Sequence, residues 1–122
     1  MSKLPSPRMR KVNEQLREVV AEAVVGLKDP RIGFLTITGV ECAPDLRHAT
    51  VFYSVLGTEQ EVASTARALA SAGRKLQAAV ASEVRLKYTP VLEFRVDPSI
   101  EHGARISKIL FDLDKGQEGP RE

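Results

Sequence analysis

Two histidines, His48 and His102, and a single cysteine, Cys42, are the side chains of this chain best suited to catalysis or metal binding. They match neither a catalytic triad nor a metal-ligand spacing, and together they cannot complete a four-ligand zinc site. The sequence also lacks the Gly-x-Ser-x-Gly turn of serine hydrolases and the glycine-rich loops that bind nucleotides. We therefore expect no enzymatic activity and no cofactor, with Cys42 as a small residue that fills space at a strand end.

The run Ser71-Ala72-Gly73-Arg74-Lys75 is the best candidate for function. Apolar residues recur at helical spacing on both sides of it, but a glycine inside a helix costs ~1 kcal/mol relative to alanine. We therefore predict two helices with a sharp bend at Gly73, which exposes unpaired backbone N–H groups that attract phosphate. A glycine also permits close approach of another backbone, and two cations follow it. Alternatively, the glycine only lets the chain turn, and the local sequence favours neither interpretation.

The distribution of charge agrees with a polyanionic partner more clearly than the net charge of +2 does. Within residues 1–12 there are four bases and no acid, and within residues 62–92 there are five bases and one acid. A basic side of this kind suits nucleic acid, although composition alone favours an ordinary solvated surface. Most of the aromatic residues fall at positions with a buried pattern, so we expect phosphate contacts and shape, rather than base stacking, to dominate binding.

The elements that must position these residues follow from apolar spacing and turn residues. Residues 1–7 predict a flexible arm, followed by a helix with Ser6-Pro7 as its N-cap and first turn, which ends before Pro30. Strands are predicted at 34–41 and 48–56, paired as an antiparallel hairpin, and at 91–97.

Between the second and third strands, Thr58 is predicted to cap the first helix of the bent pair. The helical pattern of the second continues through Leu86, so Tyr88-Thr89-Pro90 is predicted to end it. A short helical segment should follow Pro98, and 115–122 should be a disordered polar tail. Helices on one face of a three-stranded sheet give an α+β two-layer sandwich, with the order α-β-β-α-bend-α-β.

Several blocks of the sequence together are similar to one known family. They are Lys28-Asp29-Pro30-Arg31-Ile32-Gly33-Phe34, Val40-Glu41-Cys42-Ala43-Pro44-Asp45-Leu46-Arg47-His48-Ala49, Tyr53-Ser54-Val55-Leu56-Gly57 and Leu86-Lys87-Tyr88-Thr89-Pro90-Val91-Leu92-Glu93-Phe94. Over about residues 8–111, the chain resembles the ribosome-binding factor A family. The matching bend is Ser71-Ala72-Gly73, where the family usually has Ala-x-Gly.

The resemblance implies a KH-like (type II) fold for an RNA-binding domain over residues 8–114. It also implies a cytoplasmic bacterial assembly factor, a monomer without catalytic activity, membrane contact or small-molecule substrate. Such a factor binds the free 30S ribosomal subunit, assists late maturation of 16S rRNA, and matters most in the cold. The alternatives are a KH-like module that binds other structured or single-stranded RNA, and an enzyme or protein-interaction domain on the same fold.

By position, the resemblance places the RNA-facing bend at Gly73, with Arg74 and Lys75 beside it. The other candidate RNA contacts are Ser71 at the bend, Arg31 and Arg47 in the loops at the hairpin's ends, Arg8, Arg10 and Lys11 near the chain start, and Arg85 and Lys87 before the third strand. For Arg47, an ion pair with Asp45 or Asp29 is an equal alternative.

Overall fold

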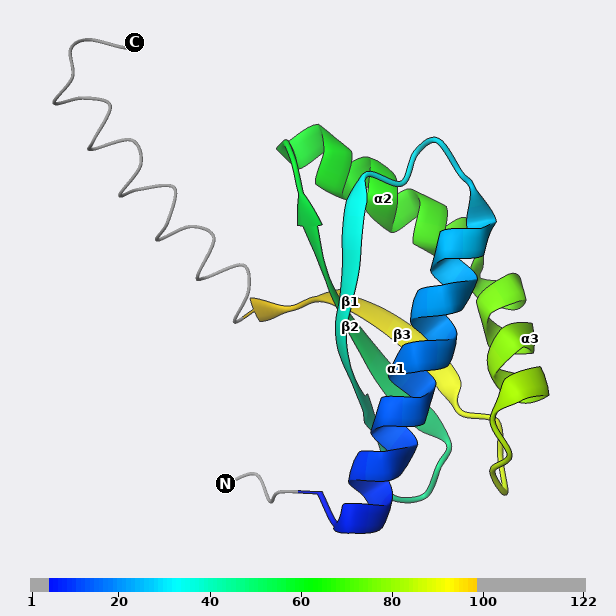
Figure 1. The fold of residues 1–122 in the computed structure, drawn as a ribbon. Helices are drawn as coiled ribbons and strands as arrows, with labels where there is room; N and C mark the ends of the chain where they lie inside the picture. Colours follow the sequence, from blue (N-terminus) through cyan, green and yellow to red (C-terminus); the bar gives the residue numbers. More distant parts are fainter. Residues whose placement is uncertain (1–4, 99–122) are drawn as a thin grey trace, which may run out of the picture.

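Six elements follow one another in the predicted order in the computed structural model, which describes residues 5–98 (Figure 1). They are α1 (Pro7–Leu27), β1 (Phe34–Cys42), β2 (His48–Leu56), α2 (Glu59–Ser71), α3 (Gly73–Glu83) and β3 (Val91–Val96). The helical segment expected after Pro98 and the expected tail lie outside the described residues, as do residues 1–4 of the expected arm.

The three strands form one mixed sheet in the order β1-β2-β3. β1 and β2 pair antiparallel, from Phe34 opposite Leu56 to Cys42 opposite Ala49, as the short connection between them predicts. β3 pairs parallel to β2, because α2 and α3 carry the chain back along the sheet before β3 begins. The helices cover one face of the sheet, and the predicted two-layer α+β sandwich is confirmed (Figure 1).

The core lies between this face of the sheet and the helices. Every fourth residue of α1 from Val12 to Val24 is buried, which matches the helical period. Alternate residues of the strands point to the same layer, including Val40 and Val51, which are paired across β1 and β2. Leu69 of α2 and Leu76 of α3 complete this core and are almost fully enclosed, so the bent helix pair is held against the sheet by burial of apolar surface.

Local hydrogen bonds fix the starts of two helices where the sequence predicts them. The Ser6 hydroxyl accepts a bond from the Met9 N–H at 3.1 Å and caps α1. Thr58 and Glu61 form a reciprocal capping box at the start of α2, with distances of 2.7 and 3.1 Å. α1 ends at Leu27, followed by Lys28 in the left-handed region at φ 54°.

Two predicted boundaries need correction. The residue that interrupts the helix pair is Ala72, at φ −88° and ψ 4°, whereas Gly73 is already the first residue of α3. α3 ends at Glu83, well before the expected end at Tyr88-Thr89-Pro90. Val84 turns to an extended conformation and is buried in the core, so its apolar character reflects burial and not a continued helix.

Candidate nucleic-acid interface

The bend between α2 and α3 is open to solvent and to an approaching backbone. A Cβ added to Gly73 would have no neighbour within 4 Å, and Gly73 is not among the described residues with positive φ. The fold itself therefore does not demand a glycine at this position. Arg74 and Lys75 are exposed, and no side chain caps the start of α3. Ser71 is also exposed, with its hydroxyl donating to the Arg67 carbonyl at 3.0 Å.

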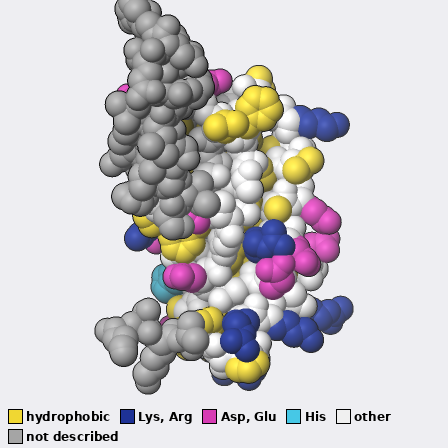
Figure 2. All heavy atoms as spheres, turned by 60° about the vertical axis from the view of Figure 1, so that its left-hand side comes forward, with side chains coloured by type: hydrophobic (Ala, Val, Ile, Leu, Met, Phe, Trp, Pro, Cys, Tyr) yellow, Lys and Arg dark blue, Asp and Glu magenta, His cyan; other side chains and the backbone are white. Residues whose placement is uncertain are grey.

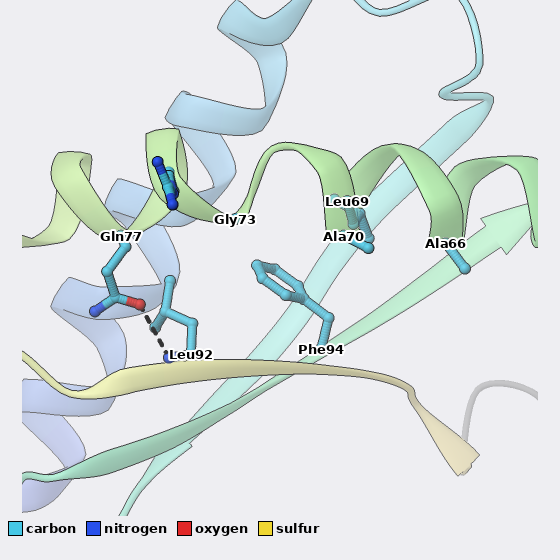
Figure 3. A pocket seen from close by; sticks show the side chains of 8 residues that line it. Ala66, Leu69, Ala70, Gly73, Gln77, Leu92 and Phe94 are labelled. Atoms are coloured by element: carbon cyan, nitrogen blue, oxygen red, sulfur yellow. Dashed lines mark hydrogen bonds between the residues drawn. The ribbon is translucent and has the colours of Figure 1, made fainter.

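A groove of about 530 Å³ runs from this bend to β3 (Figure 3), a volume in the range of sites that hold small organic groups. Its lining residues come from three elements: Ala66, Leu69 and Ala70 of α2, Gly73, Arg74 and Gln77 of α3, and Leu92 and Phe94 of β3. The sequence reasoning identified the bend but missed the groove. The sequence signal for the groove was the pair of small residues Ala66 and Ala70, spaced one helical turn apart. Both residues are exposed in the structure.

Gln77 joins α3 to the outer edge of β3. Its Oε1 accepts a bond from the Leu92 N–H at 3.2 Å (Figure 3), and its Nε2 donates to the Pro90 carbonyl. On the opposite side of β3, the Val91 N–H donates to the carbonyl of Arg47, just before β2, and the Asp97 N–H donates to the carbonyl of Tyr53 in β2. Backbone groups of successive residues point to opposite sides of a strand, so those of Leu92 and Phe94 face the groove. The groove therefore combines apolar side chains with main-chain donors and acceptors, and Arg74 lies at its border.

Several of the predicted basic contacts lie together at the end of the molecule where α1 begins, where dark blue side chains gather in Figure 2. One hollow there is lined by Arg8, Arg85 and Lys87 together with Leu46, Ala81, Ser82, Val84, Leu86 and Thr89. A second is lined by Arg47, His48, Lys87, Tyr88, Thr89 and Val91. We call Arg8, Arg47, Arg85 and Lys87 the basic end. Arg10 and Lys11 are exposed on α1 but border neither hollow.

Arg47 has neither of its expected carboxylate partners. Asp45 accepts a bond from the Arg47 backbone N–H at 3.0 Å, but none of the ion pairs formed within residues 5–98 involves Arg47. Instead, its guanidinium carbon lies 4.2 Å from the centre of the Tyr88 ring. The ion-pair alternative for Arg47 is therefore wrong, and a cation–π contact takes its place.

Arg31 borders none of these hollows and forms an ion pair with Asp29. Its guanidinium pairs with both carboxylate oxygens, the shortest distance being 2.7 Å. Together with the Arg31 backbone N–H, this contact lowers the pKa of Asp29 to about 2. The buried Thr65 accepts a bond from the Gly33 N–H at 3.1 Å and fastens the same loop to α2. In this structure the Asp-Pro-Arg motif shapes the loop that leads into β1.

Two aromatic residues are more accessible than the sequence predicts. Phe34, at the start of β1, is 78% exposed, and Tyr88 is 36% exposed. Tyr53 is buried, as expected. Side chains alternate between the two faces of β1, and Phe34 falls on the face that no helix covers. Tyr88 lies in the segment between α3 and β3. The sequence predicts little base stacking, but the structure exposes two aromatic rings on which a base could stack.

The described residues contain no group of three His, Cys, Asp or Glu side chains placed to hold a metal ion. Burial and the nearby Asp45 raise the pKa of the Cys42 thiol, which disfavours the reactive thiolate. Cys42 is the last residue of β1 and is buried, as expected of a space-filling residue. Within residues 5–98, no helix has the length and apolar character needed to cross a membrane.

The family model for ribosome-binding factor A matches residues 8–110. This chain belongs to the ribosome-binding factor A family. A ribosome-binding factor A from Geobacter sulfurreducens is 46% identical over 108 residues, which covers 88% of this chain and 92% of the relative. Another, from Rubrobacter xylanophilus, is 45% identical over 114 residues, covering 92% and 91%. The family is one of binding factors rather than enzymes, which confirms the expectation of a non-catalytic protein.

Solved structures confirm the fold. The crystal structure of ribosome-binding factor A from Thermus thermophilus matches with a TM-score of 0.66 and 33% identity, over 72% of this chain and 94% of that chain. A homology model of the Thermus thermophilus factor was fitted into a cryo-EM map of the complex between that factor and the 30S subunit. It matches with a TM-score of 0.57 and 35% identity, over 68% of this chain and 88% of that one.

Proposed function

We propose that this chain is a cytoplasmic assembly factor that binds the free 30S subunit and assists late maturation of 16S rRNA, with its greatest effect in the cold. The observation that supports this best is the family match over residues 8–110, together with the 30S complex of a relative that shares the fold. The protein acts as a monomer, without a cofactor or a small-molecule substrate. Its proposed contribution is to bind RNA and hold it in one conformation.

The bend is the proposed primary RNA contact. An RNA backbone approaches Gly73 closely because no side chain projects from this residue, and no side chain caps the start of α3 against a phosphate. Arg74 and Lys75 add two positive charges at the same point, and Ser71 adds a hydroxyl. Within residues 5–98, neither base is paired with a carboxylate, so no existing ion pair must be broken when phosphate binds.

The groove beside the bend accommodates a base. Leu69, Leu92 and Phe94 provide apolar surface for its ring, and the main-chain groups of β3 on this side other than the Leu92 N–H, which is bonded to Gln77, provide hydrogen bonds to its edge. The basic end supplies further phosphate contacts, as do Arg10 and Lys11 from α1. A contact by Arg31 stays a prediction, in which phosphate competes with Asp29 for the guanidinium.

Co-sedimentation tests this function. The purified protein is pelleted with free small subunits, free large subunits and whole ribosomes, at low and at moderate salt. We expect selective pelleting with free small subunits that survives moderate salt, because shape and position add to the phosphate contacts. Equal pelleting with every particle, lost as salt rises, indicates non-specific phosphate binding. That outcome refutes the assembly-factor function and favours the alternative of a KH-like module for other RNA.

A pair of charge reversals tests the bend in the same assay. Arg74→Glu combined with Lys75→Glu is expected to abolish pelleting with small subunits and to leave the fold intact, because both side chains are exposed. The control is Lys28→Glu with Arg95→Glu, which reverses two exposed charges that border neither the groove nor the basic end, with Arg95 also losing its exposed ion pair with Glu93. The control should pellet like wild type. Wild-type binding by a correctly folded bend variant refutes the assignment.

A further inference from the structure

The exposed Tyr88 ring has two cations beside it. The guanidinium carbon of Arg47 lies 4.2 Å from the ring centre and the Lys87 ammonium 5.5 Å from it, both within the range of cation–π attraction. Neither cation forms an ion pair with a carboxylate of the described part of the chain. Cation–π contacts with the ring therefore hold two positive side chains close together on the surface, and both keep their net charge.

A third hollow shares lining residues with both the hollow at Tyr88 and the groove at the bend. That hollow is lined by Arg74, Gln77, Ala78, Ala81, Thr89 and Val91. It shares Arg74 and Gln77 with the groove, and Thr89 and Val91 with the hollow at Tyr88. We call the three together the track. It follows α3 and the start of β3, and the short exposed side chains of Ala78 and Ala81 leave room along it for a strand.

We propose that Tyr88 and Arg47 form a base-stacking site for single-stranded RNA lying in the track. This rests on the RNA binding proposed above and extends it. RNA-binding proteins stack unpaired bases on aromatic rings and on guanidinium planes, and Tyr88 and Arg47 present one of each in contact. Lys87 borders the same hollow, and Arg85 and Arg8 border the next one, where they contact the neighbouring phosphates.

The stacking site makes the RNA contact longer than the bend alone. The Gly-x-x-Gly loop of a KH domain clamps about four nucleotides. Here α3 separates the bend from the segment that contains Tyr88, and its 11 residues extend about 16 Å. An RNA strand that fills the clamp at the bend and also stacks on Tyr88 therefore extends beyond the roughly four nucleotides that the clamp holds. Because stacking accepts any base, the second contact adds affinity and little sequence preference.

A titration followed by NMR tests this site in the full chain. Uridine oligonucleotides of about four and about eight residues are added to ¹⁵N-labelled protein. We expect the longer RNA to shift the amide signals of both Gly73–Lys75 and Lys87–Thr89. We also expect it to bind about tenfold or more tightly than the shorter one, since its second contact forms within the same complex. Tyr88→Ala should remove this gain and the shifts at Lys87–Thr89, and Tyr88→Phe should keep both.

Phe34→Ala provides the control, because it removes an exposed ring at the start of β1 and should leave both affinities unchanged. Shifts confined to the bend, or an unchanged gain in Tyr88→Ala, overturn the stacking site. So does equal binding of a duplex of the same length. In each of these cases selective pelleting with small subunits is still expected, so the proposed function survives. If the wild type does not pellet selectively with small subunits, both the proposed function and the stacking site are refuted.

Discussion

Replacing Gly73 by alanine should stabilise the protein and weaken its binding to RNA. The added methyl group meets nothing within 4 Å, and Gly73 is the first residue of α3 with no positive φ to accommodate. Alanine restricts the unfolded chain at a gain of ~0.4–1 kcal/mol where the native backbone accepts it. For a domain of about this size, such a gain raises the melting temperature by roughly 2–8 °C.

The binding loss follows from the position of the new methyl group. Gly73 borders the groove next to Arg74, so a methyl group there keeps a phosphate from close approach to the backbone at the bend. Loss of one charge-assisted hydrogen bond costs ~1.5–3 kcal/mol, which is about tenfold or more in affinity. If Gly73→Ala raises the melting temperature but weakens RNA binding, the glycine serves RNA binding and not the turn.

Thermal unfolding and co-sedimentation with small subunits measure the two effects, with Gly26→Ala as the matched control. Gly26 lies in α1, is exposed, and also has no neighbour within 4 Å of an added Cβ. Its replacement should raise stability by up to ~1 kcal/mol and leave binding unchanged. A lower melting temperature in Gly73→Ala refutes the reasoning on the backbone, and wild-type binding refutes the role of Gly73 in close approach.

Two further predictions concern the loop before β1. Thr65→Val should lower the free energy of unfolding by about 1 kcal/mol in thermal unfolding, because the Gly33 N–H loses its hydrogen-bond acceptor at 3.1 Å. Ser64→Ala, at a more accessible site, should lower it by less. Equal losses in the two variants contradict this account. The pKa of Asp29 falls from 3.8 to about 2 in the folded state, so its ion pair contributes stability above about pH 4 that is lost as pH falls through about 2. The melting temperature of the wild type should therefore exceed that of Asp29→Asn at neutral pH, and the two melting temperatures should converge near pH 2. A difference that does not change with pH contradicts a role for the Asp29 ion pair in stability.

The elements of this fold could be predicted because local residues determine them. Ser6 and Thr58 cap helices through side chains that reach backbone N–H groups within three residues. The strands could be located because alternate residues face the core, and the short loop between β1 and β2 leaves few alternatives to a hairpin. The end of α3 was placed too late because Val84 and Leu86 have helical spacing, and spacing alone does not distinguish a helix from a buried extended segment.

The sequence by itself determined the family, the order of elements and the bend, because each depends on residues close together in the chain. Only the tertiary structure decided the surface. The groove combines residues of α2, α3 and β3, and Tyr88 meets Arg47 from a different loop. Likewise, the Arg47 guanidinium lies over the Tyr88 ring and forms no ion pair with Asp45, although Asp45 is only two residues away. Whether a charged side chain faces a carboxylate, an aromatic ring or solvent depends on the packing of distant elements, which spacing along the chain does not encode.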